Sequence, residues 1–322
     1  MLLFLGKRLI QALIALFILC TIVFFMFRLL PADPTAAMVD ASLSPEAQMR
    51  IKANFGLDKP LYQQYFIYLK NMILHGDFGI SFFYRESVIS VLANRILNTL
   101  ILGTTAIVFA YSIGIVLGAL MAWYRGTVFE MSAIVGGLFF KAAPQFWTGM
   151  IFLMIFSYGL GWFPYSGIRE AGYQATGIMK YFSMDFLHHL ILPALVTGLY
   201  YLAQPMLLMR NAMLEVNNEP FIELAFAKGL PERRIIFHHA ARNALLPATT
   251  TLATKMGQLI GGIVLIEYVF SWPGLGREIV MAATRYDYPL AQASFLLIAF
   301  VVMFYNILAD LLYGFLDPRI VY

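Results

Sequence analysis

Charged residues and cysteine are both scarce in this sequence. Asp, Glu, Lys and Arg make up 12% of the 322 residues, against about a quarter in soluble domains, and 61% of the residues are hydrophobic. A soluble core could not bury this much apolar surface, so the composition predicts an integral membrane protein. The single cysteine, Cys20, lies in an apolar run and has no second cysteine with which to form an internal disulfide or a metal site.

Several classes of function lack the residues that they require. The chain has no G-x-x-x-x-G-K-[ST] phosphate-binding loop, so it is not expected to hydrolyse ATP by itself. The net charge of +4 does not indicate nucleic-acid binding, because the basic residues stand beside apolar runs, where they orient a chain in the membrane. An intramembrane enzyme would need a nucleophile with a base, or a metal-ligand set, and the predicted spans contain neither.

Six segments are apolar over the roughly 20 residues that a helix needs to cross a bilayer. They are Leu9–Phe27, Thr99–Tyr124, Ser132–Leu160, Leu190–Met209, Ala244–Phe270 and Leu290–Phe315. The first is interpreted as a retained helix rather than a signal peptide, because no small-residue cleavage site follows it. Six spans place both termini on one side. That side carries more basic residues in its short loops, so both termini are predicted to be cytoplasmic.

The long segment between the first two spans is mixed in character and is predicted to be periplasmic. Within it, Leu61–Leu74 has apolar residues at helical spacing, which predicts an amphipathic helix lying on the membrane or against the other spans. The predicted organisation is an N-terminal transmembrane helix (1–30), the periplasmic segment (31–98) and a five-helix core (99–322) with a cytoplasmic loop at 211–243.

The cytoplasmic loop is predicted to contain two short helices with a sharp bend between them. Glu219 before Pro220 is typical of a helix start, and Gly229 is typical of a helix end. Pro231 then begins the second helix.

One face of the first loop helix is a candidate docking surface. Phe221, Ala225 and Lys228 stand at i, i+4 and i+7, which places them on roughly one face, and a small residue there lets a partner approach closely. A simple cytoplasmic hairpin explains these residues equally well, so both alternatives stay open.

Motifs in this loop and along the chain resemble one transporter family. Glu223-x-Ala225-x-x-x-Gly229 resembles the EAA coupling motif of binding-protein-dependent ABC importers, and the run up to Arg234 is similar to their peptide/nickel permease branch. Further stretches that resemble this branch are Leu29–Pro34, Gly76–Ser81, Pro144–Trp147, Glu267–Gly276 and Leu316–Arg319. Their order and spacing together carry the resemblance.

The resemblance implies a type I importer permease fold in the bacterial cytoplasmic membrane. It implies alternating access for di- or oligopeptides, with Phe221, Glu223, Ala225, Lys228 and Gly229 coupling the permease to ATPases. The implied partners are a second homologous permease, two cytoplasmic ATPase subunits and a periplasmic solute-binding protein, in addition to membrane lipid. ATP and Mg²⁺ would bind the ATPases, and the chain itself would hold no cofactor or metal.

Three residues in the predicted spans are candidates for the solute pathway. Lys141 and Lys255 fall near the middle of the third and fifth predicted spans, where a charge is costly. They do not match the usual family pattern. We hypothesise that they attract a carboxylate or another anionic group of the solute; pairing with acids on a neighbouring helix remains the alternative. Gln145 is a further polar candidate.

The sequence leaves alternatives open for both the solute and the energy source. Nickel or another small solute is carried by the same family, although the spans contain no cluster of histidines or acids that favours a metal. A secondary transporter independent of ATPases would need ion-coupling residues at broken helices and commonly has repeated halves, and neither is visible.

Overall fold

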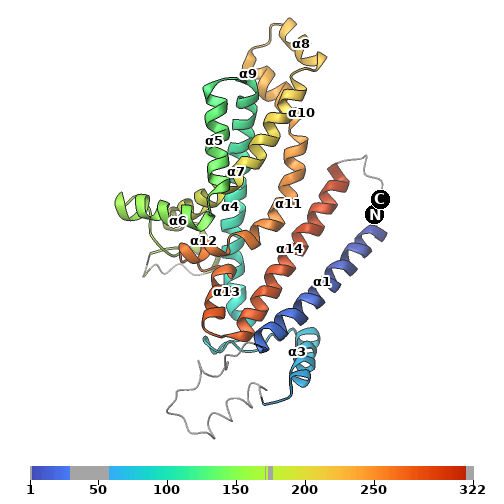
Figure 1. Cartoon of the computed structure of the whole chain (residues 1–322), viewed down its shortest axis with the longest axis vertical. Coiled ribbons are helices and arrows are strands. Elements are labelled where there is room, and N and C mark those ends of the chain that lie inside the picture. Colours follow the sequence, from blue (N-terminus) through green and yellow to red (C-terminus); the bar gives the residue numbers. More distant parts are fainter. Residues whose placement is uncertain (1, 30–57, 171, 173–176, 317–322) are drawn as a thin grey trace. The chain divides into compact units, whose positions relative to one another are not determined.

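The computed structural model describes residues 2–29, 58–170, 172 and 177–316, and within them the chain is helical (Figure 1). The only extended pairing in this part is an antiparallel bridge between Ile80 and Ser87. The predicted all-α class is therefore confirmed for the described residues. The chain divides into two compact units, one from residues 1–99 and 273–307 and the other from residues 100–272 and 308–321.

The first unit is built on α1 (Leu2–Arg28) and the first part of α14 (Tyr288–Leu316), which lie side by side (Figure 1). Phe27 near the end of α1 is buried against Tyr288 and Phe295, with ring centroids 5.6 and 6.2 Å apart. The other described helices of this unit are α3 (Leu61–His75), the first turns of α4 (Val88–Trp123) and α13 (Leu275–Thr284).

Helix α3 confirms the predicted amphipathic helix and packs on the last turns of α1. The Tyr65 ring lies 5.2 Å from that of Phe24, and its hydroxyl is 2.6 Å from Thr21 Oγ1. The apolar side chains of Tyr62, Phe66 and other residues on α3 remain exposed. A helix that keeps apolar side chains exposed along one face is suited to a membrane surface.

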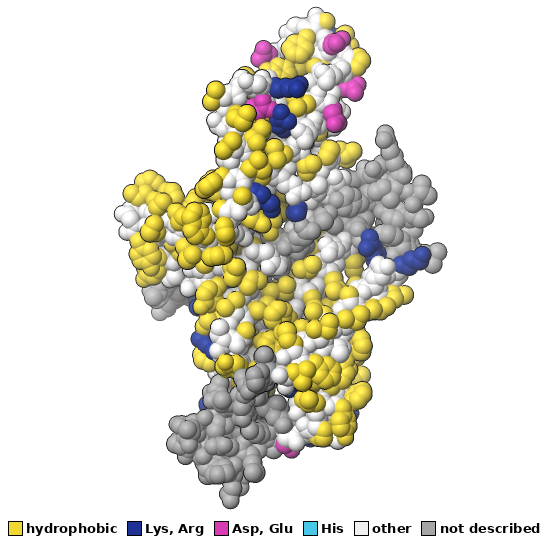
Figure 2. All heavy atoms as spheres, in the orientation of Figure 1, with side chains coloured by type: hydrophobic (Ala, Val, Ile, Leu, Met, Phe, Trp, Pro, Cys, Tyr) yellow, Lys and Arg dark blue, Asp and Glu magenta, His cyan; other side chains and the backbone are white. Residues whose placement is uncertain are grey.

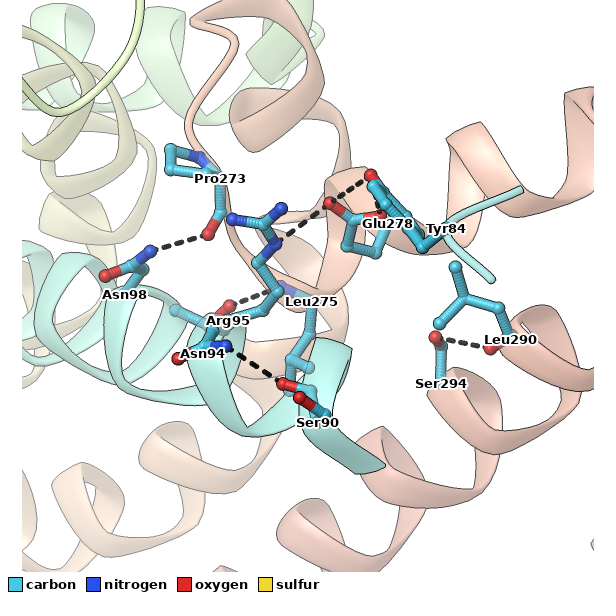
Figure 3. A network of polar contacts seen from close by, with 11 residues as sticks. Tyr84, Ser90, Asn94, Arg95, Asn98, Pro273, Leu275, Glu278, Leu290 and Ser294 are labelled. Atoms are coloured by element: carbon cyan, nitrogen blue, oxygen red, sulfur yellow. Dashed lines mark hydrogen bonds and ion pairs between the residues drawn. The ribbon is translucent and has the colours of Figure 1, made fainter. Parts of the chain in front are cut away.

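A polar network holds α13 against the start of α4 (Figure 3). The buried Glu278 carboxylate lies 3.0 Å from Arg95 Nε and accepts a hydrogen bond of 3.1 Å from the Tyr84 hydroxyl. Burial and the charge of Glu278 raise the pKa of the Tyr84 hydroxyl, so it stays protonated and donates. Asn98 Nδ2 donates to the Pro273 carbonyl at 2.7 Å. The contacts of Arg95 and Tyr84 satisfy the Glu278 carboxylate, a charge that would otherwise be costly to bury.

The second unit contains the rest of α4 and most of the other helices. The next elements are α5 (Val128–Ala142), α6 (Gln145–Phe152), the π-helical η1 (Leu153–Gly159), the 3₁₀ turn η2 (Gly177–Tyr181) and α7 (Met184–Val216). They are followed by α8 (Pro220–Ala227), α9 (Glu232–Arg234), the π-helical η3 (Ile235–Ala240), α10 (Ala241–Ala244), α11 (Leu246–Gly262) and α12 (Val264–Val269).

Helices α4 and α7 approach each other closely through glycines. A Cβ atom at Gly118 of α4 would collide with the backbone carbonyl of Met206 in α7. A Cβ at Gly198 of α7 would collide with the Phe109 ring of α4. Small residues permit this backbone-to-backbone packing, which a membrane helix pair needs because lipid supplies no hydrophobic driving force.

The predicted third span, Ser132–Leu160, is wrong as a single continuous helix. Helix α5 ends at Ala142, and α6 starts at Gln145 after a bend of 104° (Figure 1). Pro144 cannot donate a helical hydrogen bond and disfavours the helical conformation in Ala143, which is extended at φ −69°, ψ 137°. Hydropathy alone does not detect this break.

The predicted fifth span, Ala244–Phe270, is also divided, because α11 and α12 are separated at Ile263. Four described helices, α1, α4, α7 and α14, are long and apolar enough to cross a membrane, and the bent α5–η1 pair makes a fifth if it counts as one span. Residues 30–57 of the predicted periplasmic segment and residues 317–319 of the last motif lie outside the described residues.

Candidate coupling surface and solute-path residues

Helix α8 starts and ends where the sequence predicts. Glu219 is extended at φ −80°, ψ 142°, and Pro220 takes the first helical position, where its missing N–H costs nothing. At the other end Gly229 has φ +67°, and its N–H donates to the Phe226 carbonyl at 2.9 Å. The N–H of Leu230 donates to the Ala225 carbonyl at 3.3 Å, which completes a Schellman ending.

The inner face of α8 is apolar and packs on its own unit. Ile222 and Ala225 are buried in a cluster with Met213 of α7 and Ile235 of η3. The expectation that Ala225 shares an exposed face with Phe221 and leaves room for a partner is therefore wrong. Its small side chain instead allows α8 to lie close to the helices beneath it.

The outer face of α8 leaves apolar side chains unburied. Phe221 is 40% exposed and Leu224 is 54% exposed, and Glu223 and Lys228 are also exposed. Figure 2 shows acidic side chains gathered at this end of the second unit, around apolar ones. Exposed apolar side chains among charged ones on a short helix are typical of a protein-docking surface.

Two contacts that the sequence analysis missed hold this end of the unit together. The Phe226 ring of α8 stacks on the Trp123 ring of α4, with centroids 5.8 Å apart and an interplanar angle of 17°. The Arg210 guanidinium of α7 binds the Glu130 carboxylate in the first turn of α5, with Nε–Oε1 at 2.5 Å. For the Glu130–Arg210 pair, the sequence offered two signals, an acidic residue just after a glycine turn and a basic residue late in a long helix.

Lys141 does not lie in the middle of a helix, because α5 ends one residue later. Its side chain is exposed, and its Nζ lies 4.1 Å from the centroid of the Tyr200 ring of α7. The alternative that Lys141 pairs with an acid on a neighbouring helix is not seen among the described residues, where its contact is a cation–π interaction. Gln145 begins α6 beyond the bend, and its Nε2 is buried without a hydrogen-bond partner among the described residues. Lys255 is half-buried within α11.

Comparison with known proteins settles the family. A sequence profile described as "Binding-protein-dependent transport system inner membrane component" matches residues 114–322. A second, for the N-terminal part of such membrane components, matches residues 1–103. The chain belongs to this family. The predicted resemblance is confirmed, and this permease is a transport subunit of the inner membrane and not an enzyme.

Characterised relatives of this permease are similar over almost their entire length. It is 39% identical to the dipeptide transport system permease protein DppB of Escherichia coli K12 and 38% identical to the di/tripeptide permease protein DppB of Pseudomonas aeruginosa UCBPP-PA14, with 99% of each chain covered. It is 36% identical to the oligopeptide transport system permease protein AppB of Bacillus subtilis, with 93% of each chain covered.

A solved structure shows the fold of this permease. A chain of the MetNI methionine ABC transporter in an inward-facing conformation matches with a TM-score of 0.54 at 16% identity. The match covers 70% of this permease and 96% of the MetNI chain. At this identity the likeness establishes the fold alone, which is that of an ABC importer permease.

Proposed function

We propose that this permease moves dipeptides or short oligopeptides across the cytoplasmic membrane by alternating access. The observation that carries the proposal is the near full-length similarity to three permeases named for di-, tri- and oligopeptides. The exposed apolar helix α8 supports energy coupling from outside the membrane, since a self-sufficient transporter has no use for such a surface.

We also propose the topology of six spans with both termini in the cytoplasm. It counts the bent α5–η1 pair as one broken span and α11–α12 as another, in addition to the four long apolar helices. On this topology 1–30 is the N-terminal span, 31–98 is periplasmic, 99–322 is the core, and loop 211–243 faces the cytoplasm.

The proposed assembly contains a second homologous permease, two cytoplasmic ATPase subunits that bind ATP and Mg²⁺, and a periplasmic solute-binding protein. Phe221, Glu223 and Lys228 would contact the ATPase, because they are exposed on α8. Ala225 and Gly229 would act by holding α8 in place, one through packing and the other through its left-handed conformation.

Lys141, Gln145 and Lys255 are proposed to line the solute path. The Lys141 ammonium lies over the Tyr200 ring, has no acidic partner within the described part of the chain, and keeps its positive charge available for a peptide carboxylate. Gln145 Nε2, just beyond the bend, has no hydrogen-bond partner in the described part of the chain and can donate to a backbone carbonyl of the solute.

Transport by the purified complex in liposomes tests the function. Labelled dipeptide should enter only with ATP and binding protein present, and unlabelled di- or tripeptide should compete while Ni²⁺ should not. Uptake of Ni²⁺ without peptide uptake would assign the metal as the cargo. Uptake by this chain alone without ATP would identify a secondary transporter.

A further inference from the structure

The first unit contains an open pocket of about 400 Å³ near the end of α1, apart from the proposed coupling surface and solute path. Its charged lining consists of Arg28 from α1, Lys59 just before α3 and Asp77 just after it. Gln64 and Ile67 of α3 are also part of the wall. The pocket therefore combines cations, amide groups and apolar surface in one cavity.

The Arg28 guanidinium is held in a fixed position. Its Nε donates to Gln64 Oε1 at 2.8 Å, and its Cζ lies 5.0 Å from the centroid of the Phe24 ring. The Gln64 amide is itself oriented, because its Nε2 donates to the Lys59 carbonyl at 2.8 Å. A guanidinium fixed in this way loses little side-chain entropy when it binds an anion.

One donor of this guanidinium has no partner within the described part of the chain. Nη1 of Arg28 is buried and makes no hydrogen bond there. An unsatisfied charged donor is costly to bury, and a phosphate or carboxylate oxygen relieves that cost best.

The acid in the pocket does not cancel its cations. Asp77 Oδ1 accepts a hydrogen bond of 2.8 Å from the N–H of Gly79, so part of its charge is satisfied by its own loop. Two cations and one anion leave the lining with a net positive charge. Charge complementarity thus favours an anionic ligand.

The surroundings indicate that the ligand is a lipid. Ile22 and Met26 near the end of α1, and Phe66 and Ile73 of α3, expose their apolar side chains on the two helices that contribute to the pocket. Ile67 both lines the pocket and is 40% exposed, which joins the pocket to apolar surface. On a membrane protein such side chains face acyl chains, and a cation at the end of a span lies at headgroup depth.

We propose that this pocket binds the headgroup phosphate of an anionic phospholipid. Arg28 is the principal ligand, Lys59 adds a second cation at the rim, and the acyl chains run over Ile67 and the exposed apolar face of α3. The site fixes α3 to the end of α1 at the membrane interface, beside the Tyr65 and Phe24 contact.

Native mass spectrometry of the detergent-purified complex tests the proposal, with phosphatidylglycerol and phosphatidylethanolamine as alternative lipids. Phosphatidylglycerol should be retained by the unaltered complex. Arg28→Gln should weaken its binding about tenfold or more, as expected for a lost charge-assisted hydrogen bond. Lys70→Gln is the matched control, because Lys70 is an exposed cation of α3 that does not line the pocket.

A second variant keeps the test decisive if Arg28→Gln does not fold. Lys59→Gln alters an exposed side chain and leaves intact the backbone carbonyl to which Gln64 donates. It should also weaken phosphatidylglycerol binding, by a smaller factor. Equal retention of the two lipids, unchanged binding in the variants, or displacement of phosphatidylglycerol by millimolar inorganic phosphate would each overturn the proposal. None of these outcomes depends on what the permease transports.

Discussion

Glu130 at the start of α5 and Arg210 in α7 form an ion pair that joins the two helices at the end of the unit that carries α8. The second oxygen of Glu130 accepts a hydrogen bond of 2.6 Å from the Gly126 N–H. One carboxylate thus fixes both the α4–α5 turn and α7. Helix α8 packs on α7 through Ile222 and Met213, so this pair connects the helix beneath α8 to α5.

Replacing Glu130 with Gln should loosen this link. The change removes the charge that binds Arg210, whose side chain is 22% exposed, and should lower the stability of the complex by about 2 kcal/mol. Thermal unfolding of the purified complex measures the loss. Glu215→Gln, at an exposed acid near the end of α7, is the control and should have no effect. Equal stability of both variants would contradict the role given to the pair.

Replacing Gly229 with Ala should weaken the end of α8. A side chain at φ +67° costs about 1 kcal/mol, so the Schellman ending should fray and the coupling surface should lose its fixed position. The expected result is a lower ratio of peptide uptake to ATP hydrolysis. Gly6→Ala is a control within an ordinary helix, where no atom lies near the added Cβ. An unchanged ratio in the Gly229 variant would refute this expectation.

Charge on the outer face of α8 should abolish ATPase docking. Phe221→Asp with Leu224→Asp introduces two carboxylates where exposed apolar side chains are proposed to be buried by the partner. Pull-down of the tagged permease should recover at most about a tenth of the ATPase found with the unaltered chain. Each loss of about 1.4 kcal/mol in binding free energy weakens the affinity tenfold. Val128→Asp is the control, because Val128 is an 82% exposed apolar residue in the first turn of α5. Full recovery with the double variant would remove α8 from the docking surface.

Replacing Gly118 with Ala should destabilise the contact between α4 and α7. The added Cβ meets the Met206 carbonyl, a backbone atom that cannot turn away, so the expected cost is about 1–3 kcal/mol. Gly136→Ala in α5 adds the same methyl group where nothing lies near it and should be neutral. Comparing their melting temperatures in detergent tests the packing. Similar melting temperatures for the two variants would contradict the close packing of α4 against α7 at Gly118.

Replacing Lys141 with Gln should change the uptake of peptides according to whether they carry a free carboxylate. If the ammonium over Tyr200 attracts a peptide carboxylate, the half-saturating concentration for free dipeptides should rise about tenfold, as for the loss of one charged contact. C-terminally amidated dipeptides should be unaffected. The double variant with Lys255→Gln shows whether the two lysines act together. Unchanged uptake of all peptides by the double variant would rule out both residues as solute contacts.

The sequence by itself determined the helical class, the family and the limits of α8. Long apolar runs can only be helices in a bilayer, since every backbone group must be hydrogen-bonded internally. The ends of α8 were predictable because Pro220 and Gly229 act through their own backbone geometry. The motif of the coupling loop could be recognised from the order of its residues alone.

Only the tertiary structure decided which side chains meet. Ala225 faces its own unit and not a partner, because neighbouring helices cover one side of α8 and helical spacing does not say which. Hydropathy treated Ser132–Leu160 as one helix, whereas Pro144 and the packing around it produce a bend of 104°. The pairing of Glu130 with Arg210, 80 residues apart, depends on two helices lying side by side. Such long-range contacts are set by packing, which no local pattern encodes.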